Sequence, residues 1–79
     1  MDGEDRIKTL LAEVLQMPVS EISDDLTMKD LEAWDSLKHM EFVVTIEQTF
    51  GVQLTFEEII GMQSVNGTRK ILSARGIGG

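Results

Sequence analysis

The spacing of its apolar residues constrains this chain more than any other feature of the sequence. Between residues 4 and 17 the apolar side chains recur every three or four positions, at Ile7, Leu10, Leu11, Val14 and Leu15. Such spacing predicts an amphipathic helix with one apolar face. Because Pro18 disfavours helical geometry at Met17, we expect this helix to stop there.

A long connection and a second helix follow. Residues 18–35 carry turn-forming Ser and Asp residues between spaced apolar ones, so we expect a loop whose apolar side chains pin it to the core. One short helical turn is expected around Thr27–Leu31. Residues 36–50 predict the second long helix, and Gly51 ends it.

Two shorter helices complete the pattern. Thr55 and Glu58 form the capping box of a short helix that runs to about residue 60. A last helix is capped by Ser64 and runs to about residue 74. It contains Gly67, which costs about 1 kcal/mol relative to Ala in a helix interior.

These elements predict an all-α fold: a small four-helix bundle with a short third helix and a long loop between helices one and two. Residues 52–56 alternate as a strand would, but five residues have no evident partner strand. The 79 residues suffice for one domain over 1–79, with 75–79 expected as a disordered tail. The C-terminal Gly78-Gly79 is also typical of ubiquitin-like carriers. Those carriers have a β-grasp fold, and the sequence lacks the strand pattern of that fold.

Charge and cysteine content narrow the function classes. Seven basic against 14 acidic residues give a net charge of −7, and cysteine is absent. Nucleic acid is a poor partner for this charge, whereas basic protein surfaces are good ones. Disulfides, zinc–thiolate sites and a cysteine nucleophile are excluded. Since no apolar run reaches about 18 residues and the acidic N-terminus lacks a signal-peptide plan, we expect a cytoplasmic monomer.

The second long helix has two apolar stripes on opposite sides. One consists of Phe42, Val43, Ile46 and Phe50 and is the expected core stripe. The other consists of Leu37, Met40 and Val44, edged by Glu41 and Glu47. This second stripe is either a surface for docking another protein or one side of a central helix buried on both sides.

The start of this helix is the candidate functional site. Either Asp35 or Ser36 serves as its N-cap. A serine hydroxyl at a helix N-terminus is well placed to carry a phosphate ester, because backbone N–H groups and the helix dipole stabilise the negative charge. As an isolated tripeptide, Asp35-Ser36-Leu37 is a weak motif, so its context decides.

In its context the motif resembles that of the acyl carrier proteins. Asp35-Ser36-Leu37 opens a helix that continues Met40-Glu41-Phe42-Val43 and ends Glu47-Gln48-Thr49-Phe50-Gly51-Val52, and the similarity extends over nearly the whole chain. The resemblance implies that Ser36 carries 4′-phosphopantetheine, transferred from coenzyme A by a phosphopantetheinyl transferase. The thiol of that arm would hold acyl chains as thioesters, which explains why the chain itself needs no cysteine.

The resemblance also implies partners and a cargo site. The protein would deliver acyl, aminoacyl or polyketide intermediates to acyl-loading and acyl-processing enzymes, without being an enzyme itself. The residues expected to face partners are Asp35, Leu37, Met40, Glu41, Val44 and Glu47. The residues expected to line an acyl pocket between helices, unless they are plain core, are Met28, Ile46, Leu54, Ile59 and Met62.

Three residues depart from the pattern of carriers in fatty-acid synthesis. Trp34 precedes Asp-Ser where a small residue is common, and Lys38-His39 follows Ser-Leu where an acidic or neutral pair is usual. These residues resemble specialised and peptidyl-type carriers of secondary pathways. We therefore expect principal partners outside the main fatty-acid machinery.

Other functions fit the sequence less well than that of a carrier. A hydrolase could use Ser36 and His39, which share a helix edge at i and i+3, but no nucleophile elbow is present. We expect His39 instead to pack below the attachment point or to cap the pocket mouth. A calcium loop in residues 24–35 lacks the required Gly and Glu, so no metal site is expected. The main alternative is an acidic helical interaction module without a prosthetic group.

Overall fold

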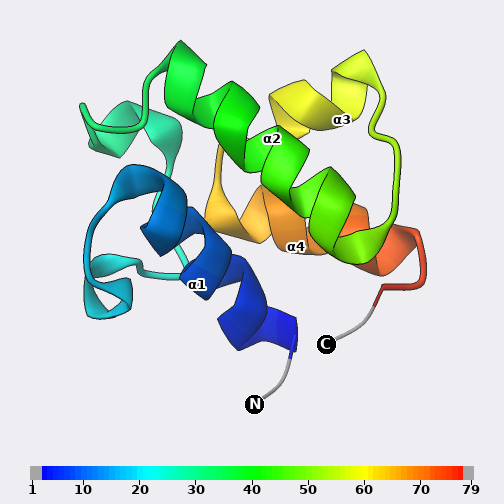
Figure 1. The fold of residues 1–79 in the computed structure, drawn as a ribbon, viewed down its shortest axis with the longest axis horizontal. Helices are drawn as coiled ribbons and strands as arrows, with labels where there is room; N and C mark the ends of the chain where they lie inside the picture. Colours follow the sequence, from blue (N-terminus) through cyan, green and yellow to red (C-terminus); the bar gives the residue numbers. More distant parts are fainter. Residues whose placement is uncertain (1–2, 78–79) are drawn as a thin grey trace.

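The computed structural model describes residues 3–77, with side chains from Arg6 onward, and these residues form a small helical bundle (Figure 1). Within that part of the chain the fold has no strand and four α-helices, which confirms the predicted class. The helices are α1 (Gly3–Leu15), α2 (Ser36–Phe50), α3 (Phe56–Gly61) and α4 (Val65–Ala74).

The first helix ends two residues earlier than expected. Gln16 adopts a left-handed conformation with φ 57°, and the N–H of Met17 donates to the carbonyl of Ala12 at 3.0 Å. This is the Schellman type of helix end, which stops α1 at Leu15 before Pro18 can act. The proline therefore follows the helix end rather than causing it.

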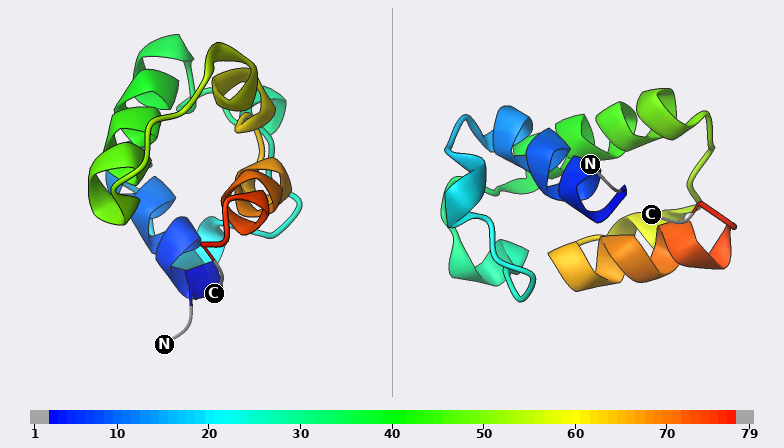
Figure 2. Two further views of the ribbon diagram at one scale, coloured as in Figure 1. Left: turned by 90° about the vertical axis from the view of Figure 1, so that its right-hand side faces the viewer. Right: turned by 90° about the horizontal axis from the view of Figure 1, so that it is seen from below.

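The helices enclose one core. The left view of Figure 2 shows α1, α2, α3 and α4 arranged around a common centre. The largest fully buried side chains come from α1, the long loop, α2, the α3–α4 connection and α4: Leu11, Trp34, Phe42, Val43, Ile46, Met62, Val65, Thr68 and Leu72. Trp34 belongs to the long loop, which shows that the loop supplies core and is not a surface excursion.

The loop between α1 and α2 is tied to the α3–α4 connection. It contains two 3₁₀ turns, η1 (Val19–Glu21) and η2 (Met28–Asp30). The second is the turn predicted around Thr27–Leu31. At the start of η2, the N–H of Met28 donates to the carbonyl of Gln63 at 2.8 Å, and just before η2 the carbonyl of Leu26 accepts from the N–H of Val65 at 3.0 Å.

An ion-pair cluster fixes the loop's first half to two helices. The carboxylate of Asp24 lies 2.7 Å from Lys8 Nζ on α1 and 3.2 Å from Arg69 Nη2 on α4. Hydrogen bonds from Lys8 and from Arg69 lower the pKa of Asp24. Asp24 therefore anchors the loop to both α1 and α4 before the chain reaches α2.

The chain after α4 has defined contacts as far as residue 77. Gly76 adopts φ 82°, and the N–H of Ile77 donates to the carbonyl of Leu72 at 2.9 Å. Arg75 donates to the carbonyl of Gln53 at 2.7 Å. These contacts differ from the disordered tail expected over 75–79, because a left-handed glycine turns the chain back onto the bundle. Gly78 and Gly79 lie outside the described residues.

Candidate functional site

Asp35 and Ser36 divide two roles at the start of α2. Asp35 is the N-cap, with extended backbone angles (φ −93°, ψ −175°) and a side-chain Oδ1 that accepts from the N–H of Lys38 at 2.9 Å. Ser36 is the first helical residue, and its side chain is exposed. The serine hydroxyl is thus not consumed by capping and faces solvent beside the N–H groups of the first turn.

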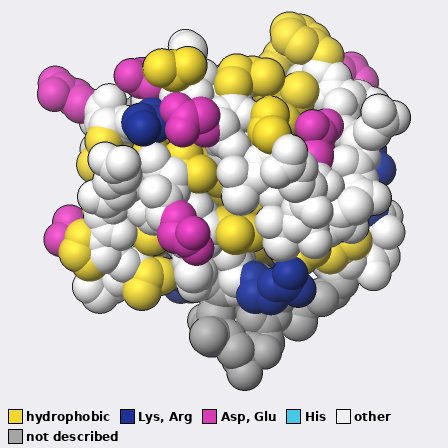
Figure 3. Space-filling view, viewed as in Figure 1, with side chains coloured by type: hydrophobic (Ala, Val, Ile, Leu, Met, Phe, Trp, Pro, Cys, Tyr) yellow, Lys and Arg dark blue, Asp and Glu magenta, His cyan; other side chains and the backbone are white. Residues whose placement is uncertain are grey.

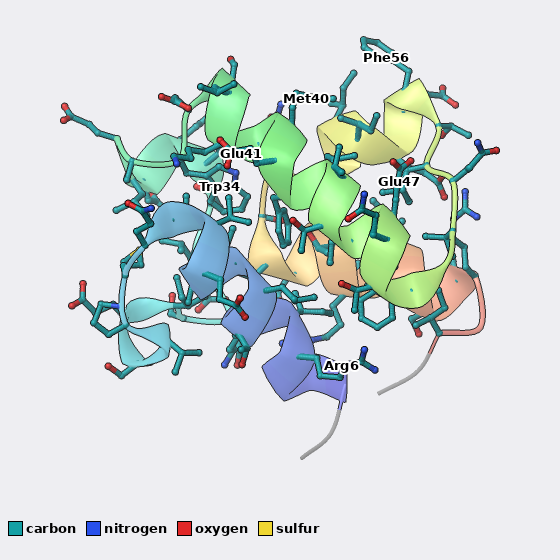
Figure 4. The ribbon with its side chains drawn as sticks, viewed as in Figure 1. Arg6, Trp34, Met40, Glu41, Glu47 and Phe56 are labelled. Carbon is teal, nitrogen blue, oxygen red and sulfur yellow. The ribbon has the colours of Figure 1, made fainter. Side chains whose placement is uncertain are left out.

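Buried aromatic rings lie beneath the start of α2. Trp34 is 1% exposed, and its indole Nε1–H donates to His39 Nδ1 at 3.1 Å; the Trp34 ring also meets Phe42 edge-on, with centroids 6.0 Å apart. Figure 4 shows Trp34 under the first turn of α2. The other ring nitrogen of His39, Nε2, lies 2.8 Å from the carbonyl of Ile59 on α3.

These two contacts decide against the hydrolase alternative. Both ring nitrogens of His39 have partners, and neither partner is Ser36. A histidine that serves as a general base needs a nitrogen within reach of the serine hydroxyl. The ring of His39 is instead buried, with Trp34 and Ile59 as its hydrogen-bond partners.

The outer face of α2 is exposed. Leu37 is 69% exposed, Met40 and Val44 are each more than two-fifths exposed, and all three line a shallow hollow of about 390 Å³ with Glu41 and Thr45. Phe42, Val43 and Ile46 on the opposite side are buried. The interpretation of α2 as a helix buried on both sides is therefore wrong.

The acidic residues near this face have different surroundings. Glu41 is exposed, with its carboxylate 3.7 Å from Lys38 Nζ. Glu47 is partly buried, and its Oε2 accepts from the N–H of Leu54 at 2.9 Å. Glu47 thus holds the α2–α3 connection against α2, a structural contact that helical spacing alone did not indicate.

The residues expected to line an acyl pocket all belong to the core or lie against it. Ile46 and Met62 are fully buried, while Met28, Leu54 and Ile59 are partly buried and pack on the buried cluster. Met28 also borders an open hollow of about 400 Å³ with Leu31, Trp34 and Gln63 among its lining residues.

Sequence reasoning missed an apolar surface on α3. Phe56 is 76% exposed and Ile60, four residues later on the same side of the helix, is 48% exposed. Figure 3 shows hydrophobic side chains gathered over α2 and α3 on the upper part of the molecule, with acidic side chains among them. The signal was present as an apolar i, i+4 pair in a helix of six residues.

The start of α2 could carry a phosphate ester on the exposed residue Ser36. Among the described residues no cluster of three or more His, Cys, Asp or Glu side chains could hold a metal ion. The exposed Ser36 at the N-terminus of a 15-residue helix offers an attachment point where a phosphodiester charge is favoured. No helix in the described part of the chain is long and apolar enough to cross a membrane.

Comparison with known proteins agrees with this chemistry. The family described as "Phosphopantetheine attachment site" matches residues 5–69, and the chain belongs to that family. It is 34% identical over 73 residues to polyketide-8 synthase acyl carrier protein 2 of Streptomyces avermitilis, which covers 91% of this chain and 83% of that protein. It is 37% identical over 62 residues to 3-methylorcinaldehyde synthase of Sarocladium schorii, covering 78% of this chain and 2% of that protein.

The protein is accordingly an acyl carrier protein of the specialised type. It carries acyl intermediates on covalently attached 4′-phosphopantetheine, and this role requires a phosphopantetheinyl transferase and partner synthase enzymes.

Proposed function

We propose that Ser36 is the attachment residue and that the cargo is a growing polyketide intermediate. The observation that carries the first half is the exposed Ser36 side chain beside an N-cap that Asp35 already provides. The second half is supported by the names of the two relatives, both of them synthases or synthase components that make polyketide or aromatic aldehyde products.

The first turn of α2 has a definite part in the attachment. Ser36 Oγ loses its proton and forms the new bond to the pantetheine-side phosphorus of coenzyme A. The P–O bond of the coenzyme A pyrophosphate breaks at that phosphorus, and adenosine 3′,5′-bisphosphate leaves. The N–H groups at the helix start stabilise the charge of the phosphodiester that remains on Ser36. The bound group supplies a thiol that holds the acyl chain as a thioester, which the chain's own side chains cannot do because cysteine is absent.

The partner surface of this proposal covers two helices. It comprises the exposed part of α2 and the exposed part of α3, namely Asp35, Leu37, Met40, Glu41, Val44, Phe56 and Ile60. Glu47 contributes to this surface indirectly, because its carboxylate holds the connection that leads to α3. A cargo chain would lie between α2 and α3, beside Met28, Ile46, Leu54, Ile59 and Met62.

The remaining assignments follow from this function. The chain acts as a cytoplasmic monomer without catalytic residues, and the partner enzymes supply the catalysis. Its partners present apolar clefts with basic edges, since exposed Leu37 and Met40 adjoin Glu41 on a chain of net charge −7. Specialised synthases, rather than the main fatty-acid enzymes, are its principal clients.

Intact-mass spectrometry tests the attachment directly. The purified protein is incubated with coenzyme A, Mg²⁺ and a broad-specificity phosphopantetheinyl transferase. The wild type is expected to gain one phosphopantetheine, Ser36→Ala none, and Ser73→Ala, which removes an exposed serine on α4, the same gain as the wild type. An unchanged wild-type mass with several transferases would instead favour the interaction module without a prosthetic group.

A further inference from the structure

His39 joins three parts of the molecule near the start of α2. It is the single histidine of the chain and is only 4% exposed. Its ring contacts Trp34 in the loop that leads to Ser36 and Ile59 in α3, while its own backbone belongs to α2. A carrier does not need this residue for chemistry, so its two hydrogen bonds call for another explanation.

The partners of the ring determine its tautomer. An indole nitrogen can only donate, so His39 Nδ1 must accept from Trp34. A carbonyl oxygen can only accept, so His39 Nε2 must carry the proton and donate to Ile59. Only the neutral Nε2–H ring satisfies both contacts. Loss of the first contact would take the acceptor from the buried indole N–H of Trp34, whereas the Ile59 carbonyl also accepts from the N–H of Met62 at 3.2 Å.

The contact with Ile59 matters because α3 is short. Its six residues cannot hold a stable position by themselves. The start of α3 is fixed by the Thr55–Glu58 capping box and by Arg75, which donates to Glu58 at 2.9 Å. The bond from His39 to Ile59 is a side-chain tie to the second half of α3, and it comes from α2.

We propose that His39 is a positioning residue that sets α3 against α2 and against the loop preceding Ser36. Through this bridge the apolar side chains of α3, Phe56 and Ile60, are held in a fixed relation to Met40 on α2, so that a partner meets one surface (Figure 4). The proposal deepens the function above and rests on Ser36 being the attachment point. Ring packing alone would not require a particular tautomer.

Matched variants of His39 separate bridging from packing. The amide of Gln offers an acceptor oxygen for the indole N–H of Trp34 and an NH2 donor for the carbonyl of Ile59. Leu fills space but offers neither an acceptor nor a donor. His39→Leu is expected to speed amide hydrogen exchange in α3 by about tenfold, with α1 unchanged, whereas His39→Gln stays within about threefold of the wild type. Nitrogen NMR of the wild-type ring is expected to report the Nε2–H tautomer.

Loading kinetics supply the functional measurement. With the transferase and coenzyme A, His39→Leu is expected to raise the KM for the carrier by about tenfold with kcat nearly unchanged, and His39→Gln to restore most of it. Leu11→Ala is the control for lowered overall stability, since it opens a core cavity on α1, and both hydrogen-bond partners of His39 lie on other elements. It should not raise the KM while the protein remains folded.

Several results would overturn the proposal. They are an Nδ1–H tautomer in the wild type, equal α3 exchange in the Gln and Leu variants, or a KM that follows stability in Leu11→Ala as well. If His39→Leu does not fold, Trp34→Phe keeps an aromatic ring, removes the N–H donor, and should speed α3 exchange in the same direction. If the wild type is not loaded at all, the attachment function fails, while the tautomer and the exchange rates still decide the bridge.

Discussion

A single carboxylate decides how Ser36 can be used. Ser and Asp are both good N-caps, and either could have satisfied the first turn of α2. Because Asp35 accepts the N–H of Lys38, the hydroxyl of Ser36 is left at the surface next to the helix start. The order of the two residues therefore matters: the first one caps the helix, and the second keeps its hydroxyl free for attachment.

Gly67 gives a prediction at the same scale. From the sequence it only lowers helix propensity, so Ala would be expected to stabilise α4 by about 1 kcal/mol. In the fold, a Cβ at this position would lie 2.1 Å from the carbonyl oxygen of Gly61 and 2.7 Å from Ser64 Oγ. We expect Gly67→Ala to destabilise the protein by about 1–3 kcal/mol, measured by urea unfolding.

Gly51 is the matched control for that substitution. It caps α2 with φ 67°, and a Cβ there would have nothing within 4 Å. Gly51→Ala should therefore show only the conformational cost of a left-handed residue, about 1 kcal/mol. A Gly67→Ala protein as stable as the wild type would mean that α3 and α4 do not approach each other as closely as described.

At the scale of the helix, α2 separates stability from recognition. Phe42 on its inner side is fully buried and Met40 on its outer side is exposed. We expect Phe42→Ala to cost about 3–5 kcal/mol of unfolding free energy and Met40→Ala less than about 0.5 kcal/mol. Met40→Ala should nevertheless raise the KM of the transferase for the carrier, and a loss of stability comparable to that of Phe42→Ala would assign Met40 to the core.

The start of α3 gives a prediction about acid. Hydrogen bonds from Arg75 and from the N–H of Thr55 lower the pKa of Glu58 from 4.5 to about 2. A lowered carboxyl pKa stabilises the fold above about pH 4.5, and this contribution is lost as the pH falls toward 2. We expect the stability difference between wild type and Glu58→Gln to be constant at neutral pH and to shrink over that window.

The measurement is thermal unfolding at closely spaced pH values. Glu57→Gln removes one negative charge at the exposed neighbouring position and is the control. A difference between wild type and Glu58→Gln that persists unchanged down to pH 2 would show that the clamp with Arg75 does not act through the ionised carboxylate.

The helices themselves were predictable because their signals are local. The capping residues Asp35, Thr55 and Ser64 and the stop at Gly51 all act within one turn of the chain, and each occupies the expected role. What joins the elements was not predictable. The bond from His39 to Ile59 spans 20 residues of sequence, and no local pattern encodes such a pair.

The candidate site also has features that the sequence predicts and features that depend on tertiary packing. The docking stripe of α2 follows from a 3.6-residue repeat, so Leu37, Met40 and Val44 could be grouped before the fold was known. Whether that stripe is exposed depends on what α1 and the loop cover, which only tertiary packing decides. Phe56 was assigned no role for the same reason.

For the molecule as a whole, ion pairing inside the fold shapes the outward charge. Among the residues that the structure describes, ion pairs join Lys8 and Arg69 to Asp24, Lys38 to Glu41, and Arg75 to Glu58. The chain has 14 acidic residues, twice the number of its seven basic residues. A basic partner approaching this protein therefore meets a field with little local positive charge to oppose it.

Added salt should consequently slow the association of the carrier with the transferase. Raising ionic strength from 0.1 M to 1 M shortens the screening length from about 10 Å to about 3 Å, so we expect kcat/KM for loading to fall by about tenfold or more while kcat changes little. Glu41→Lys should lower kcat/KM at low salt and flatten this dependence. Glu13→Lys makes the same change in net charge on the exposed side of α1, away from the outer face of α2.

Comparing these two variants distinguishes the local surface from the overall charge. If recognition is centred on α2, Glu13→Lys keeps most of the wild-type salt dependence because its site lies outside the contact. Equal effects of the two variants would show that only net charge steers the partner, and the proposed surface of α2 and α3 would then lose its electrostatic support. A loading rate independent of salt would contradict steering by either route, and apolar contact through Leu37, Met40 and Phe56 would have to account for recognition alone.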